Sequence, residues 1–329
     1  MRNVPIAISR RRKLPVGTRS GDGSLRSERA TLRVDQDQRG GRSRPLSKQP
    51  GPSVRRRQLG ATLRQLREDA GRSRKDAAEW LEIGEPTISK IELGRQAIKG
   101  PNVRVLCQLY DVDASRADYL LRLAGEANQR GWWTAYRDTV PDWFRQFVGL
   151  EGDAEVMWEY QAEYVPGLLQ TSAYVDAITR VLEPSYSDDM VARRVELREK
   201  RQAEIDGGEP PAMRVFLNEA VLRRCVGGPD VMRDQLDYLV EISKRQHITL
   251  RVVPFSAGAH AAMDGSFVMM QFPEEESPAF TYVENRRGGV YQEDPGDIAA
   301  YTVIVDQLAE PALSEADTRV LLDEVARSQ

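Results

Sequence analysis

The sequence predicts an N-terminal all-α domain of five helices, a C-terminal α+β domain and a disordered N-terminal tail. Three observations support this prediction. The chain has 329 residues, which is enough for two domains of about 100–200 residues each. Apolar residues recur at helical spacing over residues 54–128, whereas residues 130–327 mix helical patterns with strand-like runs. Residues 1–53 contain almost no aromatic or periodic apolar positions and cannot offset the entropy of ordering.

The tail is strongly basic, although the whole chain is slightly acidic. Residues 1–57 contain 16 Lys and Arg against 4 Asp and Glu, while the remainder contains 31 against 46. This asymmetry indicates nucleic-acid contact at the basic end, and a solvated leader explains it equally well. The segment "LSKQPGPSVRRRQLG" also resembles a natural protein start, which leaves open a native start near Leu46.

Composition narrows the function classes. No run approaches the ~18 apolar residues that span a membrane, and the N-terminus lacks the apolar segment of a secretory signal. The two cysteines, Cys107 and Cys225, are far apart and form no CxxC pair, which argues against a disulfide scaffold and a zinc cluster. We therefore expect a cytoplasmic, nucleoid-associated protein with no membrane contact, no metal and no cofactor.

The helices of the first domain are marked by apolar spacing and by their ends. Leu59, Leu63 and Leu66 lie on one face of the first helix. Ser73 starts the second, with Asp76 three residues later as a near capping box. The third begins after Gly84, with Glu85-Pro86 in its first turn, and ends at Gly94. Two further helices are predicted from Pro101 and over residues 115–127.

The segment "SRKDAAEWLEIGEPTISKIELG" fits a helix-turn-helix, in which the start of the second helix enters the major groove of DNA. Ala78 is small where the two helices cross, and Ile83 fills the turn. Ile88 and Ile91 lie on the inner face of the second helix and belong to the core. The outer face is left with Glu85, Thr87, Ser89 and Lys90, beside Pro86.

The stretches "RKDAA", "LEIG" and "TISKIELG" resemble the helix-turn-helix of the phage Cro and repressor class, the Xre family. Ala77 replaces the usual Leu of that family, Glu82 the usual turn Gly, and Gly84 the usual Ser cap. The last two departures predict that the turn glycine has moved two positions along the chain.

The resemblance implies a DNA interface. In this family the start of the second helix reads base edges, which here corresponds to Glu85, Pro86, Thr87 and Lys90, with Ser89 beside them. A Glu can accept from cytosine, a Thr can touch a thymine methyl group, and a Lys can donate to guanine. Phosphate contacts are implied for Arg74 and Arg95, and their charge suggests the same for Arg55, Arg56 and Arg57. For each residue, a solvated face is the alternative.

In the second domain, strands are predicted at residues 213–218, 248–255, 266–272 and 279–285. Helices are predicted at residues 188–205, 230–245, 295–313 and 314–326. Residues 154–182 are predicted helical at both ends, with a break at Pro166-Gly167. The aromatic stretch 132–147 is expected to pack in the core and between the domains.

The stretches "GWW", "PDWF", "EYVPGLLQT" and "LRVVPF" resemble the uncharacterised domain that follows a Cro/repressor-type helix-turn-helix in many regulators of filamentous, spore-forming actinobacteria. Such regulators are often encoded beside small acidic proteins in antitoxin-like pairs. The resemblance therefore implies a small acidic protein partner or an effector for this domain.

Signals for catalysis are weak. His260 and Asp264 form a candidate general-base pair, although a loop histidine with a capping aspartate is the more common arrangement. Arg286 and Arg287, before two glycines, suit either an anion site or a hairpin turn with solvated arginines. The sequence contains no GxSxG, HExxH or phosphate-binding loop motif, and we expect no enzyme.

The sequence therefore predicts a DNA-binding transcriptional regulator that acts as a homodimer on double-stranded operator DNA. Its C-terminal domain is expected to sense a ligand or to bind a small protein partner. The alternative is an antitoxin-like interaction module whose main role is to sequester that partner.

Overall fold

The structure, a computed structural model, describes residues 52–129, 131–136, 139–207, 209–273 and 279–329. The disorder predicted for residues 1–53 lies outside these ranges, except that Pro52 and Ser53 begin the first helix. An all-helical N-terminal region is followed by an α+β domain with one six-stranded sheet, as the sequence predicted. Among the described residues, no helix is long and apolar enough to cross a membrane.

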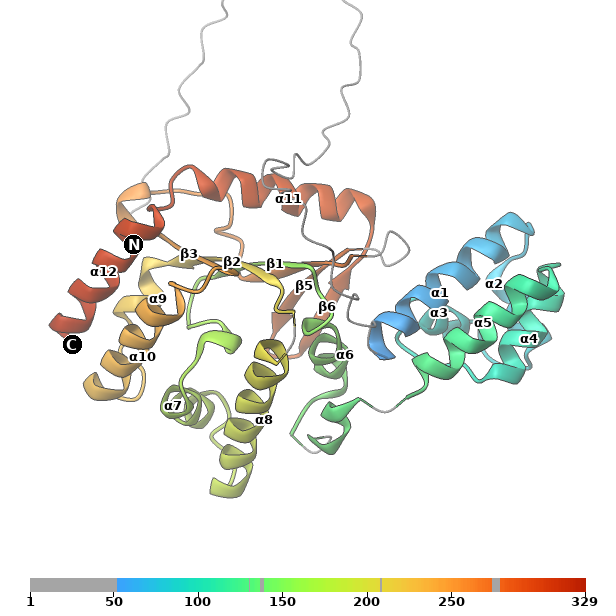
Figure 1. Ribbon diagram of the computed structural model, residues 1–329, viewed down its shortest axis with the longest axis horizontal. Coiled ribbons are helices and arrows are strands. Elements are labelled where there is room, and N and C mark those ends of the chain that lie inside the picture. Colours follow the sequence, from blue (N-terminus) through green and yellow to red (C-terminus); the bar gives the residue numbers. More distant parts are fainter. Residues whose placement is uncertain (1–51, 130, 137–138, 208, 274–278) are drawn as a thin grey trace, which may run out of the picture. The chain divides into compact units, whose positions relative to one another are not determined.

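The N-terminal region contains the predicted helices in the predicted order. They are α1 (Pro52–Asp69), α2 (Arg74–Trp80), α3 (Glu85–Glu92), α4 (Gly100–Leu109) and α5 (Ala114–Ala127). Apolar residues at helical spacing form its core, among them Leu59, Leu63, Ile88 and Ile91. Figure 1 shows α1 and α5 running alongside each other, so this pair forms a base for α2, α3 and α4.

The sheet of the C-terminal domain is mixed. Its strands are β1 (Val156–Gln161), β2 (Ala212–Asn218), β3 (Ile248–Val253), β4 (Phe267–Gln271), β5 (Phe280–Asn285) and β6 (Gly288–Gln292). They lie in the order β3-β2-β1-β4-β5-β6, with β1, β2 and β3 parallel and the other pairs antiparallel. The first strand therefore lies at the junction between the parallel and the antiparallel halves.

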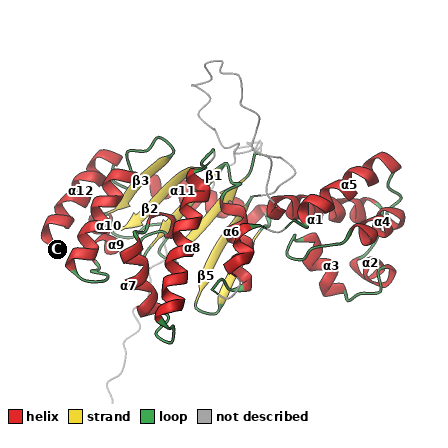
Figure 2. Ribbon diagram, turned by 60° about the horizontal axis from the view of Figure 1, so that its bottom comes forward, coloured by secondary structure: helices red, strands yellow, loops and turns green. Residues whose placement is uncertain are grey.

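Helices cover the two faces of the sheet unequally. They are α6 (Asp142–Glu151), α7 (Ser172–Leu182), α8 (Asp188–Asp206), α9 (Glu219–Arg223), α10 (Pro229–Ile242), α11 (Pro295–Ala309) and α12 (Glu315–Ser328). Short 3₁₀ helices span Trp132–Tyr136, Gly167–Leu169 and Phe255–Ala257. Of the described helices, α11 lies on one face with Val305 and Leu308 against the sheet, and α6 to α10 and α12 lie on the other (Figures 1 and 2).

The prediction for residues 154–182 was wrong at its start, because β1 lies there instead of a helix. Along β1, Met157 packs in the core beneath the larger set of helices, while Trp158 and Tyr160 pack toward α11. This alternation was concealed because Glu159 and Gln161 stand on the Met157 face, where apolar residues are expected. The short strand β6 was also not predicted, since only a hairpin turn was expected at Arg286 and Arg287.

Candidate nucleic-acid interface

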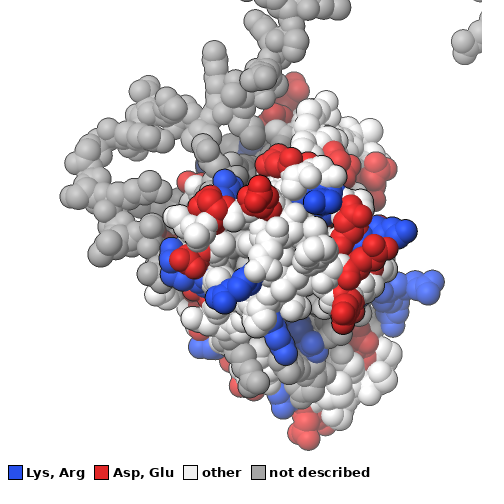
Figure 3. All heavy atoms as spheres, turned by 90° about the vertical axis from the view of Figure 1, so that its right-hand side faces the viewer, with Lys and Arg blue, Asp and Glu red and all other residues white. Residues whose placement is uncertain are grey.

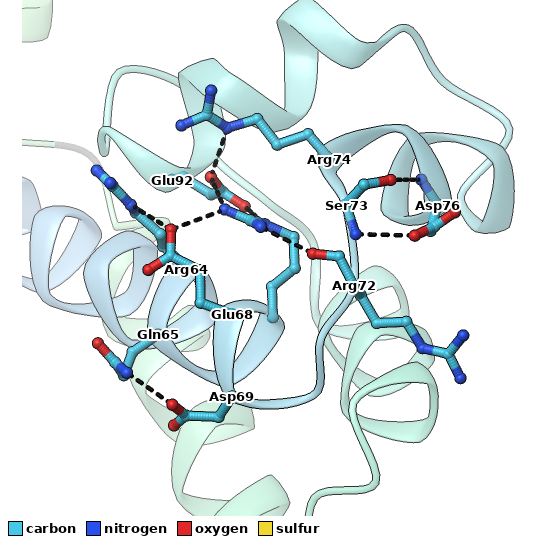
Figure 4. A network of polar contacts seen from close by, with 10 residues as sticks. Arg64, Gln65, Glu68, Asp69, Arg72, Ser73, Arg74, Asp76 and Glu92 are labelled. Atoms are coloured by element: carbon cyan, nitrogen blue, oxygen red, sulfur yellow. Dashed lines mark hydrogen bonds and ion pairs between the residues drawn. The ribbon is translucent and has the colours of Figure 1, made fainter.

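The first helix of the motif begins with the predicted capping box. The Asp76 N–H donates to Ser73 Oγ at 3.1 Å, and the Ser73 N–H donates to Asp76 Oδ2 at 2.8 Å (Figure 4). The hydrogen bond from the Ser73 N–H to the Asp76 carboxylate lowers the pKa of Asp76 below its usual range, since it favours the ionised form. The start of α2 is thus fixed by its own sequence.

The turn between α2 and α3 differs from the prediction in one respect. The left-handed residue is Glu82, with a φ of 54°, whereas Gly84 has an extended backbone with a φ of −77°. The Ile83 N–H donates to Ala78 O at 3.0 Å and the Glu82 N–H to Glu79 O at 3.2 Å, the pattern that closes a helix with a left-handed residue. The turn glycine has therefore not moved along the chain. Glu82 adopts the conformation that usually needs glycine, and Gly84 is the N-cap of α3.

The outer face of α3 begins directly at this cap. Glu85, Pro86 and Lys90 are exposed, and Thr87 and Ser89 are half-buried. The inner face is formed by Ile88 and Ile91, which are buried in the core as predicted. The start of α3 therefore presents a carboxylate, an apolar ring, hydroxyl groups and an ammonium group on one exposed surface.

The other end of α3 is fixed by a buried ion pair that sequence reasoning missed. Glu92 accepts from Arg67 Nε at 2.6 Å and from Arg67 Nη2 at 3.2 Å, and Arg74 Nε donates to the same carboxylate at 3.0 Å (Figure 4). Hydrogen bonds to Glu92 raise the pKa of Arg67, which also donates to Arg72 O at 2.9 Å. The Glu92 carboxylate thus connects α1, α2 and α3. The sequence feature that could have indicated this ion pair is the position of Glu92 directly after the inward-facing Ile91.

Two glycines allow α1 to approach α3 closely. A Cβ on Gly60 would lie 2.4 Å from Ile91 O, so a larger residue there would push the helices apart. Gly94 has a φ of 65°, and a Cβ on it would lie 2.7 Å from Arg57 Cα. Together with the ion pair of Glu92, these contacts hold the axis of α3 rigidly against α1.

The predicted phosphate contacts fall into two groups. Arg74 and Arg95 lie at the motif and keep about two fifths of their side chains exposed, at 39% each. The three arginines at the start of α1 are buried or half-buried and engage protein groups outside the motif. Arg55 pairs with Glu126 at 3.1 Å, Arg56 donates to Ala127 O at 3.0 Å, and Arg57 pairs with Glu293 at 3.0 Å.

Arg57 does not fit its predicted role. Its side chain is 2% exposed, its guanidinium carbon lies 4.7 Å from the centroid of the Phe280 ring, and burial lowers its pKa. The expectation of a phosphate contact for Arg57 is therefore not supported, because the C-terminal domain already covers it. From the sequence alone, the run "RRR" cannot be told from a solvated basic cluster. The groups that accept its hydrogen bonds lie far along the chain, and no local pattern indicates them.

The charge around the motif is mixed rather than uniformly basic. Exposed cations at Arg72, Lys75 and Lys90 alternate with exposed Glu79 and Glu85. Figure 3, which faces the side of α2 to α5, likewise shows blue and red groups interspersed. A surface with this balance attracts phosphates less strongly than a uniformly basic surface would.

Other candidate sites from the sequence are not assembled as catalytic groups. His260 lies 3.4 Å from the Tyr160 hydroxyl and accepts from the Ala262 N–H at 3.3 Å, and no hydrogen bond joins it to Asp264 in the described part of the chain. Arg286 and Arg287 are exposed in the turn of the β5–β6 hairpin. Within the described ranges, no cluster of three His, Cys, Asp or Glu residues is placed to hold a metal ion.

The aromatic stretch divides between loop and helix. Trp132, Trp133 and Tyr136 form edge-on pairs in a 3₁₀ helix, while Phe144 and Phe147 stack on α6 with centroids 5.1 Å apart. Phe147 also packs against β5, where the centroid of the Tyr282 ring lies 4.7 Å from that of Phe147. The helical part of the stretch therefore contributes to the core of the C-terminal domain.

Comparison with known families matches both parts of the chain. Residues 58–120 match a helix-turn-helix domain, and residues 144–324 match a domain of unknown function, DUF5753. A search of curated proteins found no match. The helix-turn-helix match supports DNA binding by the region built from α1 to α5. Because the second match covers more than half of the sequence, the chain belongs to the DUF5753 family, in which it carries an N-terminal helix-turn-helix domain.

Proposed function

We propose that the protein is a sequence-specific transcriptional regulator that reads DNA in the major groove with the start of α3. The observation that carries this proposal is the exposed start of α3, combined with an opposite end fixed by Glu92, Arg67 and Gly60. A recognition helix must present its side chains in one orientation, because each base pair is read by a fixed pattern of donors and acceptors. This helix meets that requirement.

The residues of α3 have different tasks in this proposal. Lys90 donates to a guanine, Thr87 contacts a thymine methyl group, and Glu85 accepts from a cytosine amino group. Arg74 contacts a phosphate through its terminal nitrogens, since its Nε is already bound to Glu92. Glu92 then serves as a positioning residue that orients both the recognition helix and this arginine.

The proposed homodimer follows from the geometry of the major groove. A monomer presents one recognition helix and reads one half-site, so a homodimer reads two half-sites separated by about 34 Å, one turn of DNA. The small acidic partner implied by the family resemblance would act on the C-terminal domain of this dimer.

Binding to a selected operator tests the roles of these side chains. Lys90→Ala and Thr87→Ala are expected to relax the preference for one base pair each, with a loss of about 1–3 kcal/mol against the best site. Arg74→Ala is expected to weaken binding to all sequences and to reduce the salt slope by about 1. The measurement is equilibrium binding by fluorescence anisotropy at several salt concentrations.

A matched control is Arg122→Ala, which removes an exposed cation from α5, outside the motif. It should leave both sequence preference and salt slope unchanged. If Lys90→Ala and Thr87→Ala kept the wild-type preference, α3 would not be the recognition helix. If a small partner protein copurified with the Lys90→Ala chain and the wild-type chain bound no DNA site selectively, the antitoxin-like role would be the better account.

Contacts between the end of α3 and the C-terminal domain suggest how regulation reaches the DNA. Glu293 lies 3.0 Å from Arg57 and 4.0 Å from Arg95, and the Arg95 guanidinium carbon lies 5.7 Å from the centroid of the Tyr291 ring. An effector that displaces β6 would change the position of Arg95, one residue beyond the glycine that ends α3. In this proposal, effector binding competes with or supports a phosphate contact of Arg95.

A further inference from the structure

The C-terminal domain contains a cavity between its sheet and the helices α6, α7 and α8. It has two connected parts, of about 190 and 120 Å³, which share Phe144, Tyr164, Gln170, Arg198 and Glu284 as lining residues. These volumes are below the ~300–1,000 Å³ of typical pockets for drug-sized ligands. Its size therefore suits a small metabolite.

The cavity lies beside the carboxyl end of β1. From β1 the chain extends the sheet to one side through β2 and β3, and then returns to the other side of β1 with β4. Open sheets of α/β proteins bind their ligands where the strand order reverses in this way. The fold thus places the cavity where a ligand site is expected.

Polar side chains line the cavity next to the sheet, although this face of the sheet otherwise packs in the hydrophobic core. Glu159 and Gln161, from β1, are 6% and 8% exposed, and Gln161 Nε2 donates to Glu159 Oε1 at 2.8 Å. Gln170, at 3% exposure, donates to Val165 O at 2.8 Å. The Oε1 atoms of Gln161 and Gln170 have no hydrogen-bond partner among the described residues. Buried acceptors without donors are rare in folded proteins, because each costs free energy.

One cation in the cavity also lacks a partner. No hydrogen bond or ion pair joins Arg198 to any described residue, and its Nε is buried. Its neighbour one helical turn later shows the usual arrangement, since Arg201 is held by both oxygens of Glu151, with Nε at 2.7 Å. Arg198 is packed against the backbone of Gly167, where a Cβ would meet its guanidinium group. The guanidinium is therefore positioned, but its counter-ion is not supplied by the protein.

Burial acts on two of the charged groups that line the cavity. It raises the pKa of Glu159 to about 7 and lowers the pKa of Arg198 to about 9. Both shifts have the same cause, since a charge that leaves water without a partner is destabilised. A ligand that carried the opposite charges would relieve both costs.

Apolar side chains form part of the remaining walls. Phe144 and Phe147 from α6, Val175 and Ile178 from α7, and Leu197 from α8 contribute side chains to one or other part of the cavity. These groups offer contact area to an apolar side chain but no hydrogen bonds. The lining thus combines the unpaired guanidinium of Arg198, two unpaired amide oxygens and apolar side chains.

We propose that this cavity binds a small zwitterion with a carboxylate, an ammonium group and an apolar side chain, the chemistry of an apolar α-amino acid. The carboxylate pairs with Arg198, and the ammonium group donates to Gln161, Gln170 and Glu159. The apolar side chain lies against the walls formed by α6 and α7. Only the regulatory consequence of ligand binding depends on the function proposed above. Binding to the cavity itself is measured without DNA.

Titration calorimetry on the full chain tests the proposal. The probes are L-leucine, L-phenylalanine, 3-phenylpropanoate, phenethylamine and inorganic phosphate. At least one of the two amino acids should bind. The two phenylalanine analogues, which lack the ammonium group and the carboxylate respectively, should bind at least about tenfold more weakly than L-phenylalanine if that amino acid binds.

Two substitutions locate the site. Arg198→Met and Gln170→Leu should each weaken amino-acid binding at least about tenfold, whereas Arg233→Met, on the exposed surface of α10, should not. Thermal unfolding without ligand provides a second readout, because Arg198→Met removes an unpaired, partly buried charge and should raise the unfolding midpoint. A variant that is more stable and yet binds more weakly cannot owe its loss of binding to misfolding.

Three outcomes would overturn the proposal. They are the absence of binding by both amino acids, wild-type affinity in the Arg198→Met chain, and binding of phosphate or 3-phenylpropanoate as tight as that of the amino acids. The last outcome would leave a site for anions alone. Since Lys90→Ala leaves the cavity intact, amino-acid binding that persists in this variant separates the ligand site from DNA recognition by α3.

Discussion

Buried and partly buried ionisable side chains in this protein are of two kinds. Glu92 and Glu151 are each held by a buried arginine, whereas Glu159 has only a neutral amide and Arg198 has no partner among the described residues. Removing a charge from water without a counter-ion is costly, so proteins rarely keep such groups where stability alone is at stake. Perturbed titratable groups that line a cavity are characteristic of functional sites.

The raised pKa of Glu159 predicts how the stability of the fold depends on pH. Its pKa is raised from 4.5 to about 7, so the folded chain binds the proton more tightly than the unfolded chain, and stability falls as pH rises through this range. Glu159→Gln removes this penalty while keeping an oxygen for Gln161. We expect it to increase the free energy of unfolding by about 3 kcal/mol at pH 8 and by much less at pH 4.5.

Urea unfolding at the two pH values measures this difference. Glu155→Gln, at the exposed residue directly before β1, is the matched control and should have little effect at either pH. Equal effects of Glu159→Gln at both pH values would show that the carboxyl group does not titrate differently on folding.

At the scale of elements, the turn of the helix-turn-helix carries a conformational cost. Glu82 is left-handed, which costs a residue with a Cβ of order 1–3 kcal/mol, partly offset because glycine loses more entropy on folding. Glu82→Gly is therefore expected to stabilise the helix-turn-helix domain by about 1 kcal/mol and to leave DNA recognition intact. Thermal unfolding of the full chain checks this expectation.

Glu79→Gly is the matched control, because residue 79 lies within α2 and glycine there should cost about 1 kcal/mol. The two substitutions remove the same side chain three residues apart and should act in opposite directions. A loss of stability with Glu82→Gly would contradict the assigned turn geometry.

The same elements show what the sequence could and could not predict. α1 to α5 were predictable because their apolar spacing, caps and glycines are all local signals. The ion pair between Arg67 and Glu92 was not, since its partners are 25 positions apart and either residue alone suits a solvated face. β1 was missed because Glu159 and Gln161 interrupt its apolar pattern, and both line the cavity. Prediction therefore failed where a polar site replaces core packing.

For the molecule as a whole, α1 is shared between the two domains. Val54 belongs to the core of the C-terminal domain, while Leu59 and Leu63 on the same helix belong to the core of the helix-turn-helix domain. A rigid helix common to two cores transmits displacement from one to the other more directly than a flexible linker does. This arrangement supports regulation of DNA recognition by the C-terminal domain.

A row of aromatic side chains connects the proposed ligand site to the proposed DNA interface. Phe147, which lines the cavity, packs against Tyr282, whose centroid lies 5.0 Å from that of Tyr291. Tyr291 in turn contacts Arg95, beyond the end of α3. Ligand binding that shifts Phe147 would therefore reach α3 through contiguous packed groups, a physical route for coupling.

The central claim is that α3 reads base sequence, and selection from a random duplex library tests it most directly. The full chain is expected to enrich two half-sites with centres about 10 base pairs apart. The Lys90→Ala chain should enrich the same spacing with a relaxed preference at one position of each half-site. Enrichment of no motif by the wild-type chain, or of an identical motif by the Lys90→Ala chain, would contradict the account.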